Sequence, residues 1–98
     1  MRELVVHNTH AHRFELSIDK QVAFIEYRIE SQLDDDRVVY VFVHTKVPES
    51  LRGRGIGMHL AEGALEYVMA HGVKVRSECS FISAYLTQHS QYKDLIAD

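Results

Sequence analysis

The sequence has little of what builds a disulfide framework or a membrane span. Its 98 residues include one cysteine, one proline and no tryptophan. A single cysteine excludes an internal disulfide and favours a reducing compartment, so we expect a cytoplasmic protein. The longest uninterrupted apolar run is Val38–Val43, six residues, far short of the roughly 20 that cross a bilayer as a helix. Met1–Leu4 lacks the apolar stretch of a secretory signal, which supports the expectation of no membrane association.

The chain is also too short for a second domain. Its length lies just below the common domain size of about 100–150 residues. A hydrophobic fraction of 46% and a charged fraction of 26% are typical of a globular domain. The sequence contains no repeat, no low-complexity tract and no linker. We therefore predict one domain over residues 1–98, present as a monomer or a weak dimer.

Basic residues are in the minority, and their distribution is uneven. The formal net charge of −3 argues against a nucleic-acid partner. Residues 1–45 hold five basic and eight acidic residues, whereas residues 46–76 hold five basic and three acidic ones. This basic stretch indicates either a localised anion site or chance variation, because a difference of two charges is small.

Hydrophobic periodicity divides the chain at Pro48. Before it, alternation predicts strands at residues 14–18 and 21–31, a short strand at 4–6, and a strand buried on both faces at 37–47. After it, apolar residues from Ile56 to Val68 recur at helical spacing, and Gly72 stands where a helix C-terminal glycine is expected. A strand at 73–76 and a helix at 80–89 complete the order. We predict a small α/β (α+β) fold with a mixed sheet, in which an antiparallel meander precedes a β-α-β crossover and a C-terminal helix.

The most informative segment joins the meander to the long helix and is rich in glycine and arginine: Arg52-Gly53-Arg54-Gly55-Ile56-Gly57-Met58. The first N–H groups of a helix lack helical acceptors, and the helix dipole favours an anion there. Glycine lets backbone N–H groups approach phosphate oxygens, and arginine supplies cationic donors. A P-loop and a dinucleotide fingerprint both fail to fit, because Met58-His59 stands where their residues are required. The segment therefore predicts a diphosphate site, in preference to a plain connection with surface arginines.

This segment resembles the Q/R-x-x-G-x-G/A signature of GNAT-type N-acetyltransferases, which use acetyl-coenzyme A. The similarity covers roughly residues 12–96, and Phe24–Arg28, His44-Thr45 and Cys79–Tyr85 are similar to the minimal single-domain members. The resemblance implies that backbone N–H groups of the glycine-rich segment cradle the pyrophosphate and that the strand end before it pairs its backbone with the pantetheine arm. The residues so assigned to cofactor binding are Val43, Thr45, Val47, Arg52, Gly53, Arg54, Gly55, Ile56, Gly57 and Met58.

Three residues are candidates for catalysis. Cys79 opens the last helix, where the dipole would favour a thiolate, so it is either a nucleophile that forms an acyl-cysteine intermediate or a packing residue. In the rival mechanism an amine attacks the acetyl thioester directly. Tyr85 is then the acid or a core residue, and His44 or Glu26 is a possible base. The acceptor is an amine, either a small molecule or a protein lysine.

Two alternatives remain beside the enzyme. One is a non-catalytic (acyl-)CoA-binding module, and the other is an interaction protein without a ligand. A further pattern, His7-x-x-His10-x-His12, has the residue type of a metal site. No Cys, Asp or Glu accompanies it locally, so we expect an incidental surface cluster and no metal.

Overall fold

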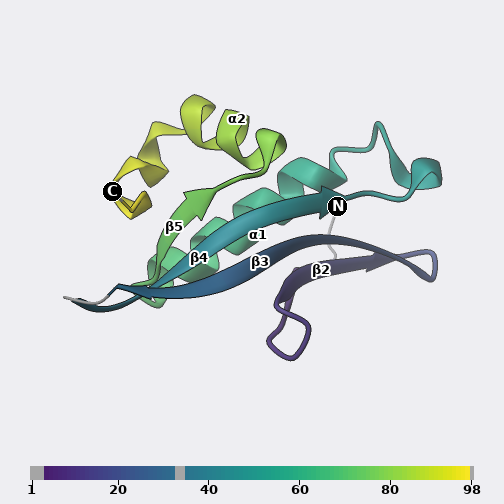
Figure 1. The fold of residues 1–98 in the computed structure, drawn as a ribbon. Helices are drawn as coiled ribbons and strands as arrows, with labels where there is room; N and C mark the ends of the chain where they lie inside the picture. Colours follow the sequence, from purple (N-terminus) through teal and green to yellow (C-terminus); the bar gives the residue numbers. More distant parts are fainter. Residues whose placement is uncertain (1–3, 33–34, 98) are drawn as a thin grey trace.

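The computed structural model describes residues 4–32 and 35–97 and forms one five-stranded sheet (Figure 1). The strands lie in chain order, and the first four pair with one another in antiparallel fashion. The fifth runs parallel to the fourth, which confirms the predicted crossover. The strands are β1 (Val6–Asn8), β2 (Arg13–Ile18), β3 (Gln21–Gln32), β4 (Asp35–Lys46) and β5 (Lys74–Ser77). The first strand starts two residues later than predicted.

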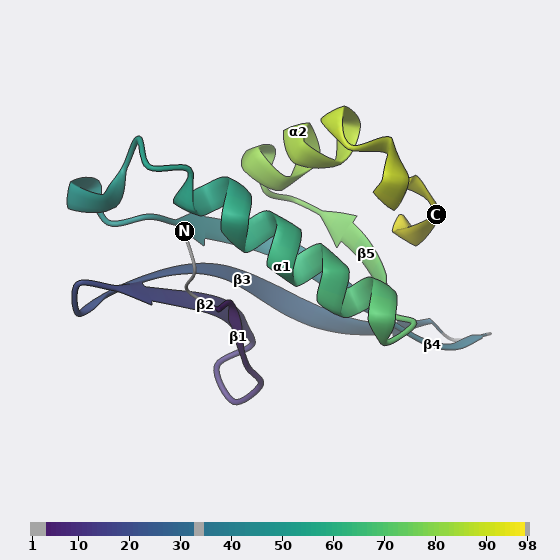
Figure 2. The same cartoon turned by 180° about the vertical axis from the view of Figure 1, so that it is seen from behind.

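The helices follow the predicted order. A 3-10 turn, η1 (Glu49–Leu51), precedes the long helix α1 (Ile56–Ala70), and α2 (Ser80–Gln88) continues into η2 (Ser90–Leu95). Gly72 follows α1 with a φ of +68°, the left-handed conformation expected at a helix C-terminus. Figure 2 shows α1 lying lengthwise across one face of the sheet.

The two faces of the sheet are covered differently. The face under α1 carries the core, where Phe14, Ile25 and Phe42 pack against Leu60 and Leu65. On the other face Val39 and Val41 are equally buried, although neither belongs to that core. An ion-pair network lies around these two valines, in which Arg28 joins Glu30 and Glu78 at 3.0 and 2.9 Å, and Arg76 joins Glu30 at 2.7 Å.

The sheet opens between β4 and β5. Their paired residues end at Phe42 and Ser77, and the N–H of Glu78 makes a last bond of 2.8 Å to the Phe42 carbonyl. From there β4 continues along β3 alone, while the chain after β5 turns away into α2 (Figure 1). The register of β3 and β4 shifts at the same point, since Glu26 faces His44 and Tyr27 faces Phe42, which leaves Val43 as a β-bulge. The edge of β4 beyond the bulge is therefore open on the β5 side within the described residues.

Candidate cofactor and catalytic site

The glycine-rich segment turns the chain from η1 into α1. Gly53 and Gly55 have φ values of +79° and +74°, a left-handed conformation that strains other residues. Gly55 is the N-cap of α1, and no side chain in the described part of the chain caps this helix end. The first helical bond runs from the His59 N–H to the Gly55 carbonyl, so the preceding N–H groups have no helical acceptor. No acidic residue lies in the first turn. This helix end is therefore suited to an anion.

The first turn of α2 packs beside this loop. A Cβ added to Gly57 would lie 3.1 Å from Phe81 Cζ, so glycine lets the two helix starts approach closely. The cavity beside them has a volume of about 250 Å³. Its lining contains seven of the ten residues predicted to bind the cofactor, together with Leu51 and Phe81; the seven are Val47, Arg52, Gly53, Gly55, Ile56, Gly57 and Met58.

Three predicted cofactor residues lie outside this lining. Val43 and Thr45 lie on β4 at and beyond the bulge, where the sheet opens. Arg54 projects toward the β2–β3 turn, with its Nη1 atom 3.6 Å from Asp19 Oδ2. Arg52 instead donates from Nε to the Val47 carbonyl at 3.3 Å. The two arginines of the loop therefore have different partners.

Cys79 lies where the open end of the sheet meets α2. It is the N-cap of α2 and is 8% exposed, and its Sγ is 3.3 Å from Thr45 Oγ1. Ser77 fixes its backbone, because the Ser77 hydroxyl donates to the Cys79 carbonyl at 2.9 Å and accepts from the Cys79 N–H at 3.2 Å. The thiol is thus held at the side of β4 where the pantetheine arm is expected.

Tyr85 belongs to the core beneath α2. Its side chain is 5% exposed, and its ring stacks on His89 at 3.8 Å. Burial raises the pKa of Tyr85, and the carboxylates of Glu62 and Glu66 on α1 raise it further. The phenol therefore keeps its proton at neutral pH.

His44 and Glu26 lie on the opposite face of the sheet from Cys79. They face each other across β3 and β4 at the bulge. The His44 side chain is exposed, that of Glu26 is half-buried, and the next residue, Thr45, is the one that contacts Cys79. Because successive strand residues point to opposite faces, the structure brings Thr45 to Cys79 and separates both from His44.

The predicted surface cluster of histidines is wrong for His7. Its Nε2 atom is 2.5 Å from the Tyr27 hydroxyl, and its ring stacks on Phe14 at 4.3 Å and meets Tyr67 edge-on at 4.4 Å. Burial lowers the pKa of His7, and the nearby His71 and His12 lower it further. Across residues 4–32 and 35–97, no group of three or more His, Cys, Asp or Glu side chains is arranged to hold a metal ion.

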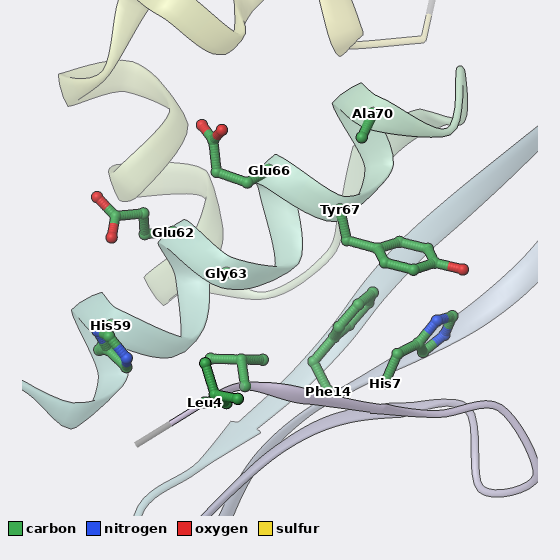
Figure 3. Close-up of a pocket in the computed structure, with 10 residues that line it drawn as sticks. Leu4, His7, Phe14, His59, Glu62, Gly63, Glu66, Tyr67 and Ala70 are labelled. Carbon is green, nitrogen blue, oxygen red and sulfur yellow. The ribbon is translucent and has the colours of Figure 1, made fainter. Parts of the chain in front are cut away.

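His7 lines a larger groove of about 810 Å³ between the N-terminal segment and α1 (Figure 3). Figure 3 shows Tyr67 pointing from α1 toward His7 and Phe14. Further along α1, Gly63 contacts the N-terminal segment, since a Cβ there would lie 2.6 Å from Val5 Cγ2. No predicted cofactor or catalytic residue lines this groove. No local pattern in the sequence signals the groove, because it depends on where the N-terminal segment docks.

A membrane-spanning helix is not found in the described part of the chain, where each helix is too short or too polar.

Comparisons with known proteins agree with this geometry. A family model described as GCN5-related N-acetyl-transferase matches residues 13–95. Protein NATD1 of Danio rerio is 31% identical over 94 residues, which cover 86% of this chain and 86% of that protein. Protein NATD1 of Homo sapiens is 41% identical over 46 residues, 47% of this chain and 41% of that protein.

A solved structure has the same fold. The NMR structure of a GCN5-like protein from Staphylococcus aureus matches with a TM-score of 0.64 and 25% identity, over 99% of this chain and 91% of that chain. The mixed sheet with its two helices is thus a GNAT fold, as the resemblance of the glycine-rich segment implied. The chain therefore belongs to the GCN5-related N-acetyl-transferase family.

Proposed function

We propose that this protein binds acetyl-coenzyme A and transfers the acetyl group to an amine. The observation that carries the proposal is the uncapped start of α1 behind a glycine-rich loop, next to the open edge of β4. The uncapped N–H groups and left-handed glycines fit a pyrophosphate. The edge of β4 from Val43 to Lys46, with Val47 directly after it, fits the amide groups of a pantetheine arm, in the manner of strand addition.

Acetyl-coenzyme A would supply an activated acetyl thioester, and two sets of side chains in this chain can act on it. In the covalent route the Cys79 thiol would give up its proton and attack the acetyl carbonyl carbon, and coenzyme A would leave as a thiolate that takes up a proton. An amine would then displace the acetyl group, and the amine proton would return to the Cys79 sulfur. In the direct route the amine attacks that carbon, Glu26 or His44 takes the amine proton, and Tyr85 returns a proton to the departing thiolate.

Cys79 and the candidate bases Glu26 and His44 lie on opposite faces of β4, so separate substitutions test the nucleophile and the bases. Mass spectrometry of the protein after incubation with acetyl-CoA detects acetylation of Cys79 if the covalent route operates. A Cys79→Ala protein that forms acetylated amine at the wild-type rate would exclude it, and a Glu26→Gln, His44→Gln double variant tests the direct route.

Binding itself is tested by calorimetry with coenzyme A. We expect wild-type protein to bind and Arg54→Glu to bind at least tenfold more weakly, because the charge reversal lies beside the proposed pyrophosphate site. Lys93→Glu carries the same charge change on exposed η2 and should bind like wild type. Absence of wild-type binding at millimolar coenzyme A would contradict the proposal.

One observation favours a second candidate, a CoA-binding module without catalysis. Cys79 and Tyr85 are both buried, at 8% and 5% exposed, so both serve core packing in this conformation. An assay of free CoA release with a panel of small amines and lysine peptides separates the two functions, since a binding module releases none. A cytoplasmic location and a monomeric or weakly dimeric state stay predictions, testable by fractionation and by sedimentation.

A further inference from the structure

The tip of the β2–β3 hairpin lies against the glycine-rich loop. Asp19 and Lys20 form its two-residue turn, with Ile18 paired to Gln21 on either side. Both turn residues have positive φ values, +53° and +66°, although neither is glycine. Asp tolerates this conformation better than most residues, whereas Lys does not. The hairpin therefore keeps two charged residues at a position where Asn-Gly would be the less strained choice.

Two contacts connect this tip to the segment that leads into α1. The Ser50 hydroxyl donates to Gln21 Oε1 at 2.9 Å. The Arg54 guanidinium and the Asp19 carboxylate approach to 3.6 Å, with 48% and 71% of their side chains exposed. A residue far from the glycine-rich signature in sequence thus reaches the arginine in the middle of it.

The Asp19 carboxylate contacts the same Arg54 guanidinium that a bound phosphate would contact. Carboxylates and phosphates both bind the guanidinium through the same N–H donors. A diphosphate bound at the start of α1 must therefore share Arg54 with Asp19 or displace the Asp19 carboxylate. The negative charge of that carboxylate also repels the diphosphate. Because about half of the Arg54 side chain and most of the Asp19 side chain are exposed, their attraction is weak enough for exchange.

We propose that Asp19 sets the affinity of the anion site by competing for Arg54, and this inference rests on the proposed coenzyme A site. Asp19 acts through Arg54 and is a positioning residue. Its carboxylate pairs with the guanidinium beside the hairpin tip, and a bound anion would take its place. Removing the carboxylate charge while keeping the turn should therefore strengthen binding of anions at the loop.

The test is Asp19→Asn, since Asn adopts the left-handed turn conformation as readily as Asp. We expect coenzyme A and inorganic pyrophosphate to bind about two- to fivefold more tightly, the range expected from an exposed ion pair. The gain should shrink as salt rises. In an Arg54→Gln background, Asp19→Asn should change affinity by less than about 1.5-fold, because the partner it frees is gone.

Glu49→Gln is the matched control, as it removes one exposed negative charge from η1 and leaves the Asp19–Arg54 pair in place. Unchanged or weaker binding by Asp19→Asn would overturn the inference, as would an equal gain from Glu49→Gln or an equal gain without Arg54. Thermal unfolding of each variant shows whether the hairpin is intact, and Asp19→Ser repeats the charge removal. Absence of wild-type binding to coenzyme A would instead overturn the proposed function.

Discussion

The two ends of α1 are stabilised by different parts of the chain. At its start the chain relies on backbone conformation, with left-handed Gly55, uncapped N–H groups and exposed arginines. Toward its other end, α1 lies against stacked rings, with Tyr67 meeting His7 and Phe14 and pairing with His71 at 3.9 Å. Changes at the start should therefore act on ligand affinity, and changes at the far end on stability alone.

Phe14→Ala should have the largest effect on stability. Phe14 is 1% exposed and lies at the centre of a ring cluster formed with His7, Tyr27 and Tyr67. Truncation of a buried phenylalanine costs about 3–5 kcal/mol because it leaves a cavity. Urea unfolding followed by circular dichroism measures the loss. Phe24→Ala, on the opposite face where Arg13 lies 4.3 Å over a half-buried ring, should cost less than half as much. Equal losses of unfolding free energy would show that the ring cluster contributes no more to stability than the opposite face of the sheet.

Gly55→Val separates affinity from stability. Its left-handed φ of +74° should make a β-branched residue cost about 1–2 kcal/mol of unfolding free energy, and the distorted loop should lower coenzyme A affinity at least tenfold. Gly72→Val is the matched control, because Gly72 has a φ of +68° and, like Gly55, open space around its Cβ position. It should lose similar stability and keep its affinity in calorimetry. If both variants lost affinity equally, the loop would have no special role.

The start of α1 was largely predictable from the sequence, because its structure depends on local conformation. The glycine-rich loop, the helix after it and the strand before it depend on short-range conformation, so periodicity and glycine positions placed them. The bulge at Val43 and the separation of His44 from Cys79 depend on strand register. Register is set by pairing across the sheet, which no local pattern specifies.

The ring cluster was not predicted because it also depends on contacts between elements distant in the sequence. His7 precedes β2 by a few residues, yet its partners Tyr27 and Tyr67 come from β3 and α1. The histidine pattern in the sequence was compatible only with an incidental surface cluster or a metal site. The contacts of His7 with three separate elements, which leave it half-buried, are a property of the assembled fold.

His7 should make this end of the molecule sensitive to pH. Burial, with His71 and His12 nearby, lowers its pKa below the ordinary value of 6.5, so the unfolded chain binds the proton more tightly. The stability that neutral His7 provides is complete above pH 6.5 and is lost as pH falls through the lowered pKa. Glu30 and Glu78, whose pKa values Arg28 lowers below 4.5, contribute losses only at more acidic pH.

We therefore expect His7→Phe, which keeps the stacking on Phe14, to lose less stability than wild type between pH 7 and pH 5.5. The difference should be below about 1 kcal/mol, because His7 is only partly buried. Urea unfolding at the two pH values measures it. His10→Gln removes an exposed histidine from the same segment and should follow wild type. The assignment fails if His10→Gln flattens the pH dependence as much as His7→Phe.

Gly63→Ala should have the smallest net effect, because two contributions oppose each other. Alanine favours a helix interior by about 1 kcal/mol over glycine. Its Cβ would lie 2.6 Å from Val5 Cγ2, so the N-terminal segment must shift. We expect a net change within about 0.5 kcal/mol, together with faster hydrogen exchange of β1 and unchanged coenzyme A affinity. The Val5 Cβ lies 2.7 Å from the same position, so the conflict is relieved only in a Val5→Gly background, where the same substitution should stabilise the protein by about 0.5–1 kcal/mol. Equal effects in both backgrounds would mean that Val5 does not pack on α1, and the far end of the helix would then be no more dependent on side-chain packing than its start.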